Sequence, residues 1–203
     1  MKRVFLALIF LLLMFGVYWI FLKKKDNGPA APKDAPIAIG ARSAAFNNSL
    51  DSLLNNYFQL KEAFVNSDSI AVKTLAGKLF TLIDAIPLNE IKKDTSAKQN
   101  AAVLYSTDSI SLADVKYFTD SLTKSTDLVT MRHAFSSINE DLYSFLKGIN
   151  YSGKNLYWQN CPMAFGDDQG ADWISDTLAI RNPYLGHKML TCGDTKDTIK
   201  AKQ

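Results

Sequence analysis

The sequence predicts an all-α protein: an N-terminal transmembrane helix, a bundle of four or five helices, and a loop-rich C-terminal arm that holds the cysteines. Three observations lead to this prediction. Residues 4–22 form a run of 19 residues without a charge. Between residues 43 and 150, apolar residues recur at intervals of three and four, which is the period of a helix with one buried face. After Gly148 that period stops and turn-forming residues become frequent.

The apolar run at residues 4–22 predicts a membrane anchor in segment 1–25. At about 1.5 Å per helical residue it nearly spans a hydrocarbon core of roughly 30 Å. It is longer than the apolar core of about 7–15 residues in a secretory signal, so an uncleaved anchor is favoured over a cleaved signal. Basic residues flank both ends and nearly balance the positive-inside rule. Because small domains on such anchors usually lie outside the cytoplasm, we expect a single-pass inner-membrane protein with its C-terminal domain in the periplasm.

Residues 26–42 are rich in proline, alanine and glycine and are expected to form an extended linker. The bundle, residues 43–150, begins with a helix expected over residues 46–64. Asn66-Ser67-Asp68 interrupts the apolar pattern and supplies an N-cap for a second helix over residues 72–86. Pro87 ends that second helix.

Two weaker apolar patterns predict the middle of the bundle. A short third helix is expected near residues 96–106, and another would begin at a cap formed by Ser109 or Ser111. The last helix is expected over residues 128–145 and ends at Gly148. Short connections between these segments imply antiparallel packing, and their apolar stripes are interpreted as core without chemistry.

The C-terminal arm, residues 151–203, holds both cysteines, and each has a methionine close by. Cys161 and Met163 are two residues apart, so in an extended segment they would share one face. Met189 and Cys192 are three apart, which one turn of chain brings together. Two thiols and two thioethers form a soft ligand set that suits Cu(I).

A disulfide is the alternative use of the two cysteines, and in an oxidising compartment it is the more common one. A Cys161–Cys192 bridge would stabilise the fold by on the order of 3–4 kcal/mol through the unfolded state. The two uses can coexist if the thiols are oxidised when no metal is bound. His133 points away from the core stripe of the last helix. It is either a surface histidine or, if the arm folds over that face, a further ligand.

The arm also carries a resemblance to a known family. Its motifs are Cys161-Pro162-Met163-Ala164-Phe165, Gly170-Ala171-x-Trp173-Ile174-Ser175 and Asn182-Pro183-Tyr184-Leu185-Gly186-x-Lys188-Met189-Leu190-x-Cys192-Gly193. Over about residues 45–199 the chain resembles a family of uncharacterised bacterial helical domains. That family occurs as small exported proteins and fused to periplasmic adaptor subunits of copper and silver efflux pumps.

The resemblance implies copper or silver handling, with Cys161, Met163, Met189 and Cys192 as candidate ligands and His133 as a further one. The Cys-Pro-Met core also resembles the short heavy-metal-binding segment of copper-transporting ATPases and efflux adaptors. That segment usually has histidine after the methionine, where this chain has alanine.

The expected function is therefore a membrane-anchored periplasmic metal-binding module for Cu(I) or Ag(I), with a copper efflux system as partner. The alternative is a structural or interaction domain stapled by a Cys161–Cys192 disulfide. We expect no enzyme, because the chain lacks a Cys-x-x-Cys pair, a glycine-rich phosphate loop and a His-Glu-x-x-His helix. The net charge of +3 derives from residues flanking the first apolar run, so nucleic acid is not an expected partner.

Overall fold

The computed structural model describes residues 42–92 and 101–202, all of which belong to one compact unit. The described elements are α2 (Ala44–Val65), α3 (Ser69–Asp84), α4 (Asn89–Lys92), α5 (Ala101–Lys124), α6 (Leu128–Gly148), β1 (Leu156–Cys161), β2 (Ala171–Ser175), the short 3-10 helix η2 (Gly186–Lys188) and β3 (Asp194–Ile199).

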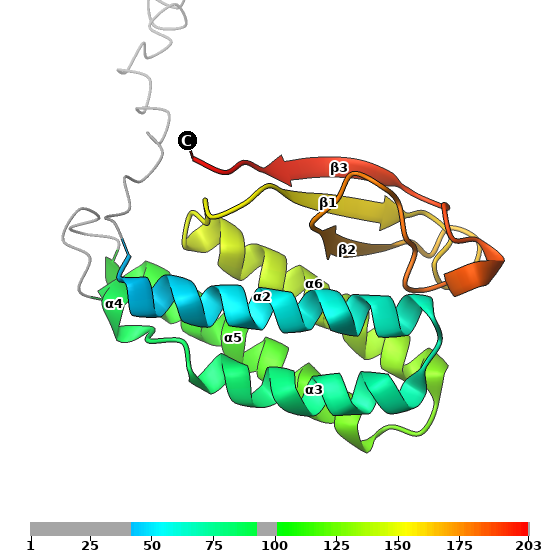
Figure 1. The fold of residues 1–203 in the computed structure, drawn as a ribbon, viewed down its shortest axis with the longest axis horizontal. Helices are drawn as coiled ribbons and strands as arrows, with labels where there is room; N and C mark the ends of the chain where they lie inside the picture. The colour runs from blue at the N-terminus through cyan, green and yellow to red at the C-terminus, as the bar shows by residue number, and fades with distance from the viewer. Residues whose placement is uncertain (1–41, 93–100, 203) are drawn as a thin grey trace, which may run out of the picture. The chain divides into compact units, whose positions relative to one another are not determined.

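These elements are arranged in three layers (Figure 1). The sheet lies over α2 and α6, and α3 and α5 lie beneath them. The strand order is β2-β1-β3 and both pairings are antiparallel, with Trp158 of β1 opposite Ile174 on one side and Asp197 on the other. Buried residues of the helices and of the sheet form a single hydrophobic cluster. Within it, the rings of Phe64 and Phe135 lie 4.5 Å apart.

The prediction of an all-α fold is wrong, because the C-terminal arm contributes a three-stranded antiparallel sheet. The strand with the weakest signal in the sequence is β3. The sequence of β3, Asp-Thr-Lys-Asp-Thr-Ile, lacks the apolar alternation that marks a half-buried strand. Charged side chains are common on such edge strands because they prevent pairing with other chains.

The predicted anchor at residues 4–22 lies outside the described residues, as does all of the predicted linker except Arg42. Within residues 42–92 and 101–202, no helix combines the length and apolarity that crossing a membrane requires. The expectation of a single-pass inner-membrane protein with a periplasmic domain is corrected on this finding and is withdrawn.

Side-chain caps fix where three of the helices begin. Ser43 Oγ accepts a hydrogen bond from the backbone N–H of Phe46 at 3.0 Å, and the carboxylate of Glu90 in turn accepts from Ser43. Asp68 caps α3 by accepting from the N–H groups of Ile70 and Ala71, which confirms the predicted cap. Asp127 caps α6 in the same way. Each cap satisfies backbone donors that the first helical turn leaves without partners.

The predicted break at Ser109 or Ser111 is wrong, because α5 is one continuous helix from Ala101 to Lys124. Ser111 is buried on the same face as Leu112 and Val115, so it faces the other helices and does not cap a new one. The core contacts of this face outweigh the weak helix preference of serine.

Asp108 gives α5 a buried carboxyl group. It faces Gly148 of α6, where an added Cβ would lie 2.3 Å from the Asp108 Oδ1 atom. Its Oδ2 atom has no hydrogen-bond partner among the described residues. Burial raises the pKa of Asp108 from 3.8 to about 6, although the positive charge of Arg42 offsets part of the effect.

This raised pKa predicts a pH-dependent loss of stability. Between about pH 4 and pH 6 the folded state binds more protons than the unfolded state, so the free energy of unfolding from Asp108 falls as pH rises. The variant Asp108→Asn has no titratable group at this position and so lacks this pH dependence. Its free energy of unfolding, relative to that of the wild type, should increase by about 1–2 kcal/mol between pH 4 and pH 7, after allowance for solvent screening. Urea unfolding at both pH values measures the difference, and an equal offset at both would contradict it.

Candidate functional site

Cys161 and Cys192 meet at one end of the sheet. Their Sγ atoms lie 2.9 Å apart, although 31 positions separate the two residues in the chain. Cys161 is the last residue of β1 and is fully buried, whereas Cys192 is partly exposed in the turn before β3. Both are free thiols, and their separation exceeds the disulfide bond length of about 2.05 Å. We call these two residues the sulfur pair.

Asn182 holds the chain that carries Cys192. Its buried side chain accepts hydrogen bonds from the N–H groups of Tyr184 and Leu185, at 2.8 and 2.9 Å. Its amide donates to the carbonyl of Cys192 at 2.9 Å. One short side chain therefore closes a turn and fixes the backbone of the second cysteine.

Gly193 allows the chain to pass β1 closely just after Cys192. It has a φ of +134°, which residues with a side chain rarely adopt. An added Cβ would lie 2.5 Å from the carbonyl oxygen of Asn160 and 2.9 Å from the ring of Trp173. The approach that brings the two sulfur atoms together therefore requires glycine here.

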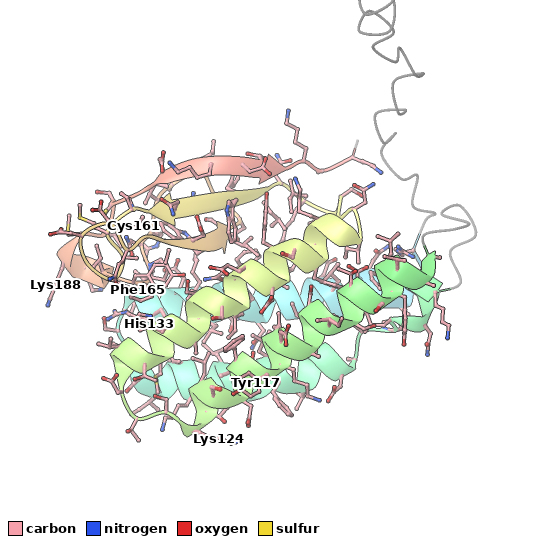
Figure 2. All side chains as sticks on the ribbon, turned by 180° about the vertical axis from the view of Figure 1, so that it is seen from behind. Tyr117, Lys124, His133, Cys161, Phe165 and Lys188 are labelled. Atoms are coloured by element: carbon pink, nitrogen blue, oxygen red, sulfur yellow. The ribbon has the colours of Figure 1, made fainter. Side chains whose placement is uncertain are left out.

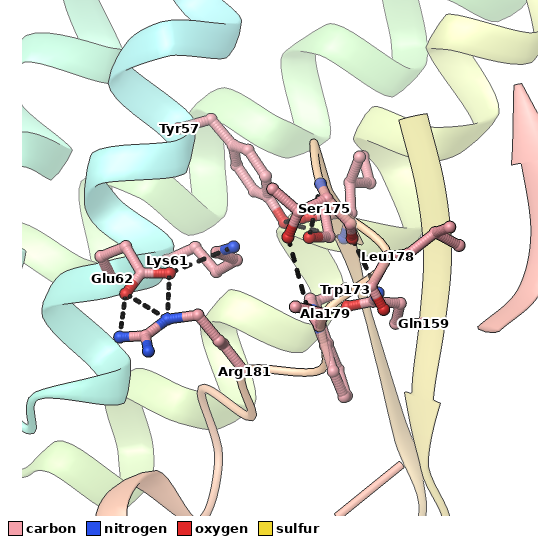
Figure 3. A network of polar contacts seen from close by, with 11 residues as sticks. Tyr57, Lys61, Glu62, Gln159, Trp173, Ser175, Leu178, Ala179 and Arg181 are labelled. Atoms are coloured by element: carbon pink, nitrogen blue, oxygen red, sulfur yellow. Dashed lines mark hydrogen bonds and ion pairs between the residues drawn. The ribbon is translucent and has the colours of Figure 1, made fainter. Parts of the chain in front are cut away.

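Gln159 and Trp173 form a buried hydrogen-bonded pair across β1 and β2 (Figure 3). Both are fully buried and lie opposite each other in β1 and β2. The indole N–H of Trp173 donates to Gln159 Oε1 at 2.8 Å. The Gln159 amide donates to the carbonyls of Thr177 and Leu178, at 3.0 and 3.3 Å. The Gln159 side chain therefore attaches the segment that follows β2 to β1, the middle strand.

A buried polar cluster joins α2 and α6 to the outer edge of β2. The amide of Asn139 in α6 donates to the Asp172 carbonyl and to the Tyr184 hydroxyl, both at 2.9 Å. The Tyr57 hydroxyl of α2 donates to Asn139 Oδ1 at 2.6 Å and accepts from the N–H of Ile174 at 3.0 Å. The Tyr184 hydroxyl also donates to the Asp172 carbonyl. Burial raises the pKa of both tyrosines well above the ordinary value, so both hydroxyls stay protonated as donors.

An ion pair clamps the arm to α2 beside this cluster (Figure 3). Arg181 donates to both carboxylate oxygens of Glu62, with a shortest distance of 2.7 Å, and Lys61 lies 3.2 Å from the same carboxylate. Burial alone would raise the pKa of Glu62, but hydrogen bonds from Arg181 and Lys61 outweigh burial and hold it low. The two-point geometry of arginine on a carboxylate fixes the orientation of the arm.

The other predicted ligands lie at exposed positions. Met163 is 41 % exposed in the turn after β1, so the expected alternation with buried Cys161 ends at the strand terminus. Met189 is 46 % exposed, although the predicted turn to Cys192 does form through a 3.0 Å backbone hydrogen bond. His133 is exposed and stacks on Phe165, with ring centres 3.8 Å apart (Figure 2).

The general prediction of a metal-binding protein is corrected by the arrangement of the described side chains. Among the described residues, no group of three or more His, Cys, Asp and Glu side chains is arranged to hold a metal ion. The His133 ring lies on the aromatic ring of Phe165 in the turn after β1. The chemistry that the geometry brings together is that of two thiols.

The electrostatics at Cys192 favour its protonated state. The hydrogen bond to Cys161, together with burial, raises the pKa of Cys192 from 9.0 to about 11. Cysteines that act as nucleophiles in enzymes have a lowered pKa, because the thiolate is the reactive form. The pair can therefore join slowly to a disulfide but is poorly suited to repeated thiol exchange.

The comparisons with known proteins concern the helical part of the chain. A family model described as "Protein of unknown function (DUF3347)" matches residues 53–154. The chain belongs to this family. The match runs from α2 to the segment before β1 and confirms an uncharacterised helical domain family, whereas the sulfur pair lies beyond it. No curated protein matches the chain, and no solved structure matches it either.

Asn139 provides a test of the polar cluster. The variant Asn139→Ala removes one hydrogen bond each from the Tyr57 hydroxyl, the Tyr184 hydroxyl and the Asp172 carbonyl, in buried surroundings. It should lower the free energy of unfolding by about 2–4 kcal/mol in urea. Asn48→Ala, at an exposed position of α2, is the control and should change stability by less than about 0.5 kcal/mol. Equal effects of the two variants would contradict the role given to the cluster.

Proposed function

We propose that this chain is a non-catalytic interaction domain in which the sulfur pair closes as a disulfide and joins the end of β1 to the chain just before β3. The observation that supports this most directly is the distance of 2.9 Å between the two Sγ atoms. The atoms need to move by less than about 1 Å to reach bonding distance. Asn182 and Gly193 already hold the backbone of Cys192 in place.

The closing reaction needs an oxidant, and a small disulfide is sufficient. The Cys192 thiolate attacks one sulfur atom of that disulfide and releases one small thiol, which leaves a mixed disulfide on the protein. The Cys161 thiolate then attacks the Cys192 sulfur and releases the second small thiol. In total, the two protein thiols lose two electrons and two protons, which reduce the small disulfide to two thiols.

A structural role fits this pair better than a catalytic one. Cys161 is fully buried and cannot be reached by a protein substrate. The raised pKa of Cys192 keeps its thiolate scarce near neutral pH. A bond that forms slowly and has one of its two sulfur atoms fully buried serves to hold the fold together.

The locked arm would present exposed apolar side chains to a partner. Met163, Leu178 and Met189 are each at least two-fifths exposed, and all three lie in the arm that the bridge would close. Methionine side chains are flexible and polarisable and suit adaptable binding surfaces. The interaction role rests on these three residues.

The staple predicts a stability difference between the oxidised and reduced protein. Closing a loop of about this length should raise the free energy of unfolding by about 3–4 kcal/mol. Urea unfolding with and without reductant measures it, and mass spectrometry after alkylation counts the free thiols. The double variant Cys161→Ala/Cys192→Ala is the control and should show no response to reductant. Two alkylatable thiols after prolonged exposure to oxidised glutathione would contradict the proposal.

Copper handling stays a prediction that rests on residue types and on the resemblance. Its link to exported proteins and to copper and silver efflux adaptors belongs to the same prediction. Two thiolates alone can hold Cu(I), and the exposed thioethers of Met163 and Met189 flank them in the sequence. Competition of the reduced protein with a chromogenic Cu(I) chelator tests it. The double alanine variant should lose any capacity to compete, and no competition by the reduced wild type would end this prediction.

A further inference from the structure

A pocket of about 560 Å³ lies where the start of α2 meets the segment that follows α6 and Lys202. Its volume is within the range of about 300–1,000 Å³ that small-molecule sites occupy. Phe46 and Leu50 of α2 and Ile149 after α6 supply its apolar wall. No part of the proposed disulfide function uses this pocket.

The hydroxyl group of Tyr151 gives the pocket an unused hydrogen-bond donor. The side chain lines the pocket and is more than nine-tenths buried. The backbone of Lys154 lies near the hydroxyl, yet no group of the described residues meets hydrogen-bond geometry with it. Burial, with a smaller effect of Asp51, raises the pKa of Tyr151 to about 12, so the hydroxyl stays protonated. A buried donor without a partner is unfavourable, and a bound acceptor would relieve that cost.

The glycine two residues on makes room for this hydroxyl. A Cβ added to Gly153 would lie 2.8 Å from the Tyr151 hydroxyl oxygen. The loop between α6 and β1 therefore places the phenol against a residue that leaves it accessible from the pocket. This arrangement is built by the fold and does not depend on a flexible surface side chain.

The charges around the pocket are mainly positive. Arg42 and Lys202 line it, and Asp51 is the one carboxylate among its described lining residues. Arg42 is held in place by its position over the Phe46 ring, at 5.5 Å. A second cavity of about 230 Å³ shares Tyr151 and Lys202 with the first and adds Lys147 and Lys200. Lys147 already pairs with Asp197, which leaves Lys200 and Lys202 as the cations that extend the positive field.

We propose that this pocket binds a small organic anion, with a single carboxylate-type charge and an apolar body. The anionic group would accept a hydrogen bond from the Tyr151 hydroxyl and face Arg42 and Lys202. The apolar body would cover Phe46, Leu50 and Ile149. A cation of the same shape would meet the positive charges and find no acceptor at Tyr151, so the pocket selects for negative charge.

Hexanoate is a suitable probe, because it combines one carboxylate with a short aliphatic chain. In an NMR titration of the purified full-length chain, hexanoate should shift the signals of Asn47, Ile149, Tyr151 and Ser152 in a saturable way. Hexylamine, of the same length and opposite charge, should not. Raising the salt concentration should weaken hexanoate binding. Unchanged signals, or equal binding of the amine, would overturn the proposal.

Two variants separate a ligand site from a structural feature. Tyr151→Phe should weaken hexanoate binding at least five-fold and leave the stability of the unliganded protein unchanged or higher, because the hydroxyl has no partner there. Lys202→Ala should weaken binding by a similar factor, whereas Lys188→Ala in η2 is the matched control and should not. A loss of stability in Tyr151→Phe with unchanged hexanoate affinity would assign the hydroxyl a structural role and refute the proposal.

Discussion

The structure depends on a few buried polar atoms that side chains of α2, of α6 and of the loop before η2 direct at the edge of β2. Tyr57, Asn139 and Tyr184 satisfy the outward-facing backbone groups of β2 that a fourth strand would otherwise pair. An unpaired strand edge buried against helices would leave several backbone groups without hydrogen bonds. The cluster therefore explains why the sheet has three strands and why it lies on α2 and α6 (Figure 1).

The position of the sulfur pair follows from this attachment. The cluster fixes β2 and Tyr184, and Gln159 and Asn182 then hold the arm on both sides of Tyr184. The chain returns to the end of β1 at Gly193, where a side chain would collide with Asn160. The thiols meet because the arm is held by hydrogen bonds along its length, before any covalent bond is formed.

Most of the helical half of the fold could be predicted from the sequence, because α2, α3 and α6 each bury a stripe with a regular period; the weaker pattern of α5 predicted two helices. The sheet could not, because β3 is polar and it pairs with residues 34 to 43 positions earlier in the chain. Cys161 and Cys192 were predicted as partners from their count alone. The exposure of Met163 and Met189 and the stacking of His133 on Phe165 could not be predicted from the sequence, because they depend on the turn that follows β1 and on the path of the chain before β3. One signal was overlooked: Asn139 follows Phe135 by four residues and precedes Leu142 by three, so a polar residue interrupts an otherwise apolar face.

The order of Cys192 and β3 along the chain has a mechanical consequence. A bond between the two sulfur atoms would enclose β2 and η2 in a covalent ring, but β3 begins two residues after Cys192 and stays outside it. Pulling on the C-terminus would therefore peel β3 from β1 while the ring keeps β2 in place. β3 could then separate from β1 by itself, which would expose one edge of β1 while the covalent ring stays closed.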